Sequence, residues 1–193
     1  MEDVNERGSE MIICGIDPGQ QGALAFIDTK RKKEWIIDMP LLPERGISAR
    51  GLYEIFLGHK KDQMFVLIEK AQSMSGQSSV AMFNYGGGYH TILAVLEILE
   101  IPFEEIRSNK WKKEFGLSGT KKAKKKTGEK KVKATADEKN AAKKQRKEMA
   151  VKTAMQMFPK LKDQFQTAKG RLLDGRAEAL LIASYGQRKL GRE

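Results

Sequence analysis

The sequence predicts an α/β protein in which a mixed five-stranded sheet is flanked by helices. Short apolar runs recur through the first half of the chain, which is typical of buried strands. Segments with helical spacing follow the third, fourth and fifth of these runs. The resulting order, β-β-β-α-β-α-β-α-α, describes a mixed sheet with helices on its faces.

The first elements are three strands and a helix. The strands are expected at 11–17, 22–28 and 34–40. MIICGID is apolar almost throughout, which predicts burial on both faces, and the short turn before GALAFID predicts a hairpin. The segment 47–60 places Leu52, Ile55 and Phe56 on one stripe, as in an amphipathic helix.

The later elements alternate between strands and helices. We expect a strand at 64–70, a helix at roughly 79–100, a strand at 101–107, a short helix at 108–116, a helix at 147–159 that ends at Pro159, and a last helix at 174–190. The last helix begins with acids and ends with basic residues, as a helix dipole favours. Three successive glycines in MFNYGGGYHT predict either a kink or loop in the long helix, or a close approach to DNA or a partner helix.

Length and charge indicate one domain with a basic insertion. The 193 residues carry a net charge of +11, and 121–147 hold 13 Lys or Arg against 3 acids. We therefore expect a loose N-terminal tail at 1–10 and a single domain at 11–193 with a lysine-rich insertion at about 119–143. Such an insertion is either a solubilising loop or an arm that binds phosphates through counterion release. Charge alone does not choose between DNA, RNA and an acidic membrane.

Other features restrict the setting and the class of protein. Cys14 has no second cysteine to pair with, which favours a reducing, intracellular compartment. No apolar stretch approaches the ~20 residues that span a bilayer, so no membrane is expected. The polar N-terminus is neither a secretory signal nor a transit peptide. Nothing resembles a phosphate-binding Gly-Lys-Ser/Thr loop, so no nucleotide cofactor is expected.

Four carboxylates form the candidate site. Asp17 and Glu69 each end a buried strand, and Asp174 and Glu178 are four residues apart on one face of the last helix. If the first and fourth strands are adjacent and parallel, all four acids meet at one sheet edge, where they would repel unless a cation were present. Hard oxygen ligands favour Mg²⁺ or Mn²⁺ over zinc and suggest two-metal phosphodiester hydrolysis. Taken singly, Asp17 reads as a turn cap, Asp174 as a helix N-cap and Glu178 as a surface residue.

Four segments carry a resemblance to a known family. GIDPGQQGALAFID, VLIEKAQSM, WKKEFGL and DGRAEALLIASYG resemble the RuvC family of Holliday junction resolvases, in the ribonuclease H-like superfamily. The likeness covers about residues 11–117 and 144–186, and it is closer to the phage, viral and organellar branches than to the typical bacterial enzyme. It implies a ribonuclease H-like fold, two Mg²⁺ ions per site and a homodimer. It also implies that the dimer binds four-way DNA junctions and nicks two opposing strands symmetrically.

The resemblance also implies roles for individual residues. Catalysis and metal binding fall to Asp17, Glu69, Asp174 and Glu178, with a basic residue before the penultimate helix that Lys147 fits by position and Lys144 fits nearly as well. The family often has its last two acids three apart and both Asp, whereas here they are four apart and the second is Glu. The lysine-rich insertion is not a general family feature.

Candidate DNA contacts come from four regions. They are Gln72 and Ser73 after the fourth strand, Phe83 and Tyr85 beside the glycines, Lys110 and Lys112 in the short helix, and Lys121, Lys122, Lys124, Lys125, Lys126 and Lys144 in and after the insertion. Each has a plain alternative: a solvent loop for 71–79, a core position for Phe83 and a solvated surface for the lysines. Trp111 is expected in the core.

Three rival functions are open to comparison. An ATPase of the actin and Hsp70 kind needs two related domains, which this length does not supply. A non-catalytic DNA-binding module would gain nothing from four carboxylates near phosphate. Another ribonuclease H-like nuclease, acting on RNA–DNA hybrids or branched DNA, shares the acids but is less well matched by the last segment, DGRAEALLIASYG.

Overall fold

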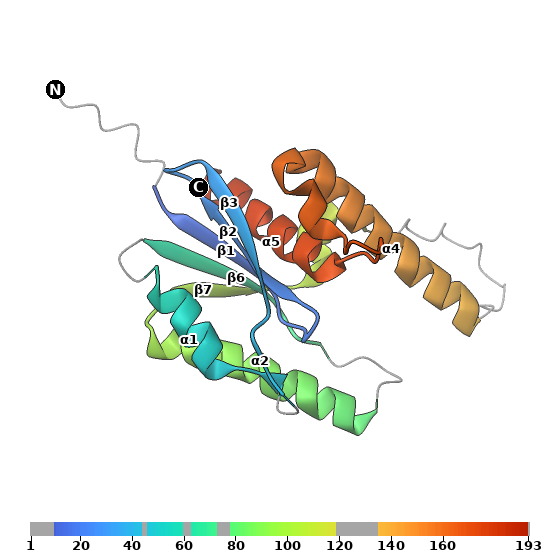
Figure 1. Cartoon of the computed structure of the whole chain (residues 1–193), viewed down its shortest axis with the longest axis horizontal. Helices are drawn as coiled ribbons and strands as arrows, with labels where there is room; N and C mark the ends of the chain where they lie inside the picture. The colour runs from blue at the N-terminus through green and yellow to red at the C-terminus, as the bar shows by residue number, and fades with distance from the viewer. Residues whose placement is uncertain (1–9, 44–45, 60–62, 73–77, 119–134, 193) are drawn as a thin grey trace, which may run out of the picture.

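A central sheet separates two layers of helices. The computed structural model describes residues 10–43, 46–59, 63–72, 78–118 and 135–192. Helices α4 (Ala136–Met157) and α5 (Asp174–Leu190) cover one face of the sheet, and α1 (Ala49–Leu57) and α2 (Ser79–Ile98) cover the other (Figure 1). Within these ranges no helix has the length and apolarity that a membrane crossing requires.

The sheet is mixed and five-stranded, as predicted. Its strands are β1 (Ile12–Asp17), β2 (Ala23–Asp28), β3 (Lys33–Asp38), β6 (Met64–Glu69) and β7 (Phe103–Ile106). Their spatial order is β3-β2-β1-β6-β7. The first three strands pair antiparallel, and β1, β6 and β7 pair parallel. Strand β1 therefore lies at the centre, between the hairpin and the parallel half.

Two short strands and a 3₁₀ segment were not predicted. Strands β4 (Leu41–Leu42) and β5 (Gly46–Ile47) pair in a separate small ribbon, and η1 (Pro159–Phe165) is a 3₁₀ helix after α4. Strands of two residues are too short to show an alternating pattern, so sequence periodicity does not reveal them. Pro159 ends α4, as expected, and opens this 3₁₀ helix.

Helix α2 runs without interruption through the three glycines. The predicted kink or loop is therefore wrong, because burial of Tyr89, Ile92 and Leu96 holds the helix in place. At Gly88 the space is tight: an added Cβ would lie 2.9 Å from Cδ1 of Ile47 in β5. Close packing by β5 accounts for one of the three glycines.

Helix α4 begins at Ala136, well before the predicted start at Lys147. The side chain of Thr135 accepts a hydrogen bond from the Glu138 backbone N–H, and the Glu138 carboxylate accepts one from the Thr135 N–H. This capping box supplies partners for two backbone donors at the start of a helix. Residues 136–143, assigned to the insertion by composition, are therefore helical.

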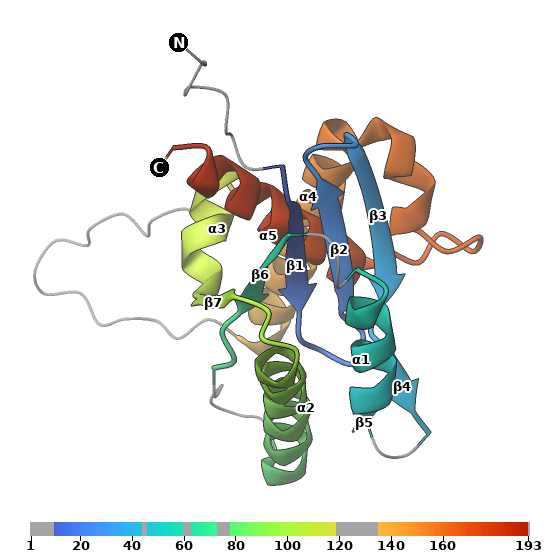
Figure 2. The same cartoon turned by 90° about the vertical axis from the view of Figure 1, so that its left-hand side faces the viewer.

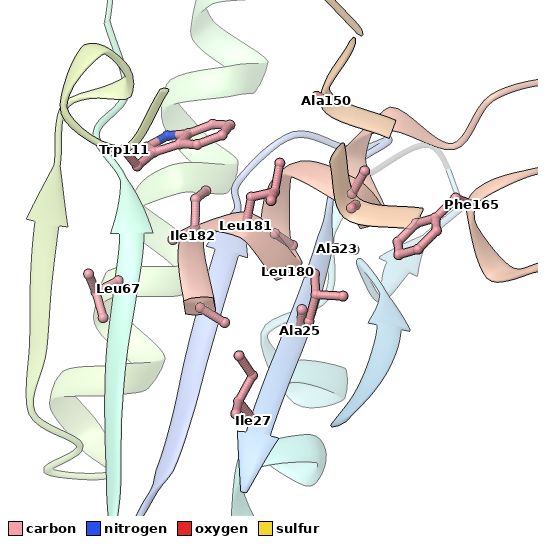
Figure 3. Packing of buried hydrophobic residues seen from close by; sticks show 14 of the residues in the cluster. Ala23, Ala25, Ile27, Leu67, Trp111, Ala150, Phe165, Leu180, Leu181 and Ile182 are labelled. Atoms are coloured by element: carbon pink, nitrogen blue, oxygen red, sulfur yellow. The ribbon is translucent and has the colours of Figure 1, made fainter. Parts of the chain in front are cut away.

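The two faces of the sheet differ in side-chain size. On the α5 face, β2 presents Ala23 and Ala25, whereas on the opposite face it presents Leu24 and Phe26. Small side chains allow α5 to lie close to the sheet, and Figure 3 shows them beneath the helix. At Gly15 of β1 an added Cβ would lie 2.2 Å from the backbone oxygen of Ala179. The small residues on this face thus set the distance at which α5 packs against the sheet.

Candidate active site

The ends of β1 and β6 bring two acids to one edge of the sheet. The strands are adjacent and parallel, which is the condition that the sequence hypothesis set, with Ile16 opposite Ile68. Asp17 and Glu69 are the next residues along, so both lie at the carboxyl-end edge. Because side chains alternate along a strand, both point to the α5 face, on which Leu67 also lies.

Two contacts fix the first turn of α5 at this edge. An added Cβ at Gly175 would lie 2.2 Å from the backbone oxygen of Gln21, so the helix rests directly on the turn between β1 and β2. From the other side, the Arg176 guanidinium donates two hydrogen bonds of 2.6 Å to the Asp38 carboxylate at the end of β3. Asp174 and Glu178 are thereby placed beside the strand ends.

The acids act electrostatically on one another. Burial, followed by the charges of Glu178 and Glu69 and to a smaller extent Asp174, raises the pKa of Asp17 to about 8. Burial likewise raises the pKa of Glu69, with a further contribution from Glu178. The other three predicted carboxylates are therefore within electrostatic reach of Asp17.

Two lysines lie among these carboxylates. Lys147 Nζ is 2.5 Å from Oδ2 of Asp174, and Lys112 Nζ is 3.3 Å from Oε2 of Glu178 and 4.0 Å from Oε2 of Glu69. Of the two candidates for the basic residue, Lys147 contacts the site. Lys144 instead extends into solvent, with its Nζ 4.0 Å from Oε1 of Glu148.

Trp111 contacts one acid of the candidate site. It lies in α3 (Ser108–Glu114), is fully buried as predicted, and donates a 2.7 Å hydrogen bond from Nε1 to Oε2 of Glu69. Lys112 Nζ lies 4.7 Å from the centroid of the same ring. Sequence reasoning identified the burial of Trp111 and missed its contact with Glu69.

Two solved structures share this arrangement of strands and helices. A structure of Thermus thermophilus RuvC in complex with a Holliday junction substrate has a TM-score of 0.51 and 13% identity, covering 94% of this chain and 95% of that one. A second Thermus thermophilus RuvC structure has a TM-score of 0.50 and 15% identity, covering 93% of this chain and 98% of the other. The fold is ribonuclease H-like. No protein-family model matches the sequence, and no curated protein matches it.

The donor set of the candidate site suits a hard divalent cation. In the described part of the chain, no three Asp, Glu, His or Cys side chains lie close enough together to share one metal ion. Asp17, Glu69, Asp174 and Glu178 nonetheless supply only carboxylate oxygens, the donors that Mg²⁺ and Mn²⁺ prefer. When all four are ionised, Lys112 and Lys147 leave an excess of negative charge. By donor type and charge, the residues fit the predicted cation.

Other predicted contacts lie around the same edge. Tyr85 is half-buried, and its pKa is raised to about 12 by burial and by the charges of Asp17 and Glu69. Phe83 is 81% exposed, so its alternative assignment to the core is wrong. Lys110 is exposed on α3. A polar groove of about 470 Å³ is lined by Lys70, Gln72, Arg107, Ser108 and Asn109.

Some predicted residues lie outside the described ranges. These are Ser73 and the insertion lysines Lys121, Lys122, Lys124, Lys125 and Lys126. Their assignment to DNA binding stays a prediction.

Proposed function

We propose that this chain is a metal-dependent endodeoxyribonuclease that cuts four-way DNA junctions. The proposal is supported by the position of Asp17 and Glu69 at the ends of adjacent parallel strands. The charges of Glu69, Asp174 and Glu178, from distant segments, act on Asp17 and support it further. Support for a junction substrate comes from the structural likeness, over 94% of this chain, to a RuvC solved with a Holliday junction.

The four carboxylates would hold two divalent ions, Mg²⁺ or Mn²⁺. When bound, such ions supply Lewis-acid activation of a water nucleophile and charge stabilisation of the leaving oxygen. The ligands must be ionised, and burial disfavours ionisation of Asp17, so this residue would give up a proton near neutral pH when a cation binds. Trp111 and Lys112 favour the ionised form of Glu69.

The lysines supply counter-charge at the site. Lys147 holds Asp174 from α4, and Lys112 holds Glu178 from α3. Each ammonium group is within reach of the edge at which a DNA phosphate would approach the acids. Ammonium groups at this edge offset the repulsion between carboxylates and phosphate until cations are bound.

The DNA backbone would extend from the acids over two basic regions. One is the groove beside Glu69 with Arg107 and Gln72, next to which Lys110 is exposed. The other is the lysine-rich segment. Each phosphate contact contributes about 0.9 to the slope of log K against log salt. Replacing Lys121, Lys122, Lys124, Lys125 and Lys126 together by Gln should therefore weaken binding and flatten this slope; an unchanged slope means that the segment does not touch phosphate.

Paired nicks require two sites, so we extend the proposal to a homodimer. Helix α2 carries large apolar residues on its solvent-facing side as well as on its buried side. Its exposed large apolar residues are Val80, Met82, Phe83 and Ile98. Contiguous exposed apolar patches mark association surfaces, and we infer that Val80, Met82 and Phe83, which lie within one turn of α2, belong to such a patch. Light scattering should report twice the mass of the chain, and Val80→Glu should reduce it.

The test is a gel assay of fixed and mobile four-way junctions with and without Mg²⁺. Wild-type protein should cut junctions only with Mg²⁺ and linear duplex far less. Asp17→Asn should lower cleavage by about a thousandfold or more, equivalent to roughly 4 kcal/mol of transition-state stabilisation, and should still bind the junction. Glu114→Gln is the matched control, because Glu114 pairs with Arg188 and Arg192 away from the acids.

Each other outcome rejects a part of the proposal. Junction binding without cleavage under any divalent ion would identify a DNA-binding module. Faster cleavage of RNA–DNA hybrids than of junctions would identify a different nuclease. Full cleavage by Asp17→Asn would remove the metal role of the acids.

A further inference from the structure

Trp111 is the largest fully buried side chain of the described residues, and Figure 3 shows it among the buried hydrophobic residues of its cluster. It belongs to the hydrophobic cluster that includes Leu67 and Ile182. A phenylalanine would supply most of the same apolar surface without a polar atom. Packing alone therefore does not account for an indole at this position.

The indole N–H accounts for it. A buried N–H without an acceptor costs about 1–3 kcal/mol, and here Nε1 donates to Oε2 of Glu69 at 2.7 Å. A hydrogen bond to an ionised carboxylate is stronger than one between neutral groups. The bond also fixes one oxygen of the Glu69 side chain at the end of β6.

Helix α3 thus holds Glu69 through two adjacent residues. The indole N–H of Trp111 and the ammonium group of Lys112 approach the same oxygen, at 2.7 and 4.0 Å. Lys112 also lies over the Trp111 ring, 4.7 Å from its centroid. A rigid, buried indole therefore contacts both Glu69 and the cation that neutralises it.

We propose that Trp111 is a positioning residue for Glu69. Its N–H holds the carboxylate in the orientation that a divalent cation requires, and its ring should therefore report cation binding. The inference rests on the proposed function, because it assigns Glu69 to cation binding. It adds a residue of the short helix to the support of the site.

The test compares Trp111→Phe with Trp35→Phe by Mn²⁺ binding, measured by electron paramagnetic resonance of free Mn²⁺ without any substrate. Outer hydrogen bonds to metal ligands are typically worth 10–100-fold in affinity, so the Mn²⁺ Kd of Trp111→Phe should rise about 10–100-fold. Trp35 stacks on Phe26 with ring centroids 4.9 Å apart. Its replacement should therefore leave the Kd within about twofold.

Fluorescence provides a second measurement if Trp111→Phe does not fold. In Trp35→Phe protein, Trp111 is the remaining tryptophan, because the chain has two. Mg²⁺ should change its emission in parallel with site occupancy, and adding Asp17→Asn should remove this change. Emission that stays constant while Mn²⁺ binds to the same protein would overturn the proposal.

The outcomes separate the two proposals. If wild-type protein binds Mn²⁺ and Trp111→Phe binds it equally well, the positioning role is wrong and the proposed function stands. If Asp17→Asn binds as much Mn²⁺ as wild type, or wild type binds none, the acids do not hold the cation. The proposed function is then wrong, and the positioning role with it.

Discussion

The acidic side chains near the two ends of α5 have opposite shifts in pKa. At its C-terminal end, Arg188 and Arg192 bind Glu114, and Lys189 binds Glu104, so each acid has a cationic partner. Hydrogen bonds from these arginines lower the pKa of Glu114. At the N-terminal end, burial and neighbouring acids raise the pKa of Asp17 to about 8. Figure 2 shows α3 beside α5.

The difference separates a structural contact from a candidate site. Surface acids with adequate cationic partners gain nothing from a divalent ion. Half-buried acids that repel one another are held in an unfavourable state by the rest of the fold, and an added cation relieves that state. The raised pKa values of Asp17 and Glu69 are therefore a stronger indication of function than the lowered pKa of Glu114.

The largest expected effect is on stability without metal. Asp17 keeps its proton up to about pH 8 when folded but loses it near its ordinary pKa of 3.8 when unfolded. The folded state thus binds more protons between these values, so stability falls as pH rises from about 4 to about 8. Asp17→Asn lacks this loss and should be more stable than wild type at pH 8 in EDTA, by about 3–5 kcal/mol.

Denaturant unfolding at several pH values measures this effect. The advantage of Asp17→Asn should grow with pH, level off above about 8, and shrink or reverse in Mg²⁺, which stabilises wild type by binding its folded state. Equal stability of the two proteins across this pH range would show that ionisation of Asp17 does not destabilise the folded state.

The second prediction concerns the contact that places the helix. Gly175→Ala should destabilise the protein by about 1–3 kcal/mol, because the new Cβ would lie 2.2 Å from the Gln21 backbone oxygen. It should also lower cleavage by shifting Asp174 and Glu178. At the other end, Gly191→Ala meets only the Gln187 oxygen at 3.4 Å and should change neither quantity much. Similar losses for both variants would mean that the hairpin does not position the helix.

Sequence alone identified the two strand-end acids and stated the strand order that would bring them together. Asp17 and Glu69 follow apolar runs, and the carboxyl ends of adjacent parallel strands share one edge. The start of α4 was predictable in principle from Thr135 and Glu138, a capping-box pair that the lysine-rich composition obscured.

The partners of Gly175, Trp111 and Lys112 could not have been predicted in the same way. Each partner lies far along the chain, and its identity depends on how closely two elements approach. Lys112 illustrates the consequence. Sequence assigned it to DNA contact because it is a lysine in a basic helix, whereas the fold turns it toward Glu178.

The third prediction concerns this lysine. Lys112→Met removes a positive charge from the acids, so it should raise Mn²⁺ affinity by roughly tenfold, or 1.4 kcal/mol. Lys189→Met is the control, because Lys189 contacts Glu104 at the opposite end of α5. Calorimetric titration measures both. Weaker Mn²⁺ binding by Lys112→Met would show that Lys112 orders the ligands rather than competing with the cation.

The smallest effect is expected at the C-terminal end of α5. Glu114→Gln removes an acid that Arg188 and Arg192 hold at the surface, and exposed ion pairs of this kind contribute little. The pKa of Glu114 is lowered in the folded state, so its contribution is present above its unfolded pKa and is lost as pH falls through the folded one. Thermal melts at pH 7 should show a slightly lower melting temperature for Glu114→Gln. This difference should disappear at about 1 M salt, where the Debye length is about 3 Å. Asp17 responds to pH in the opposite direction. The stabilities of Asp17→Asn and Glu114→Gln, plotted against pH, should therefore diverge. Parallel curves would show that the two ends of the helix do not differ in this respect.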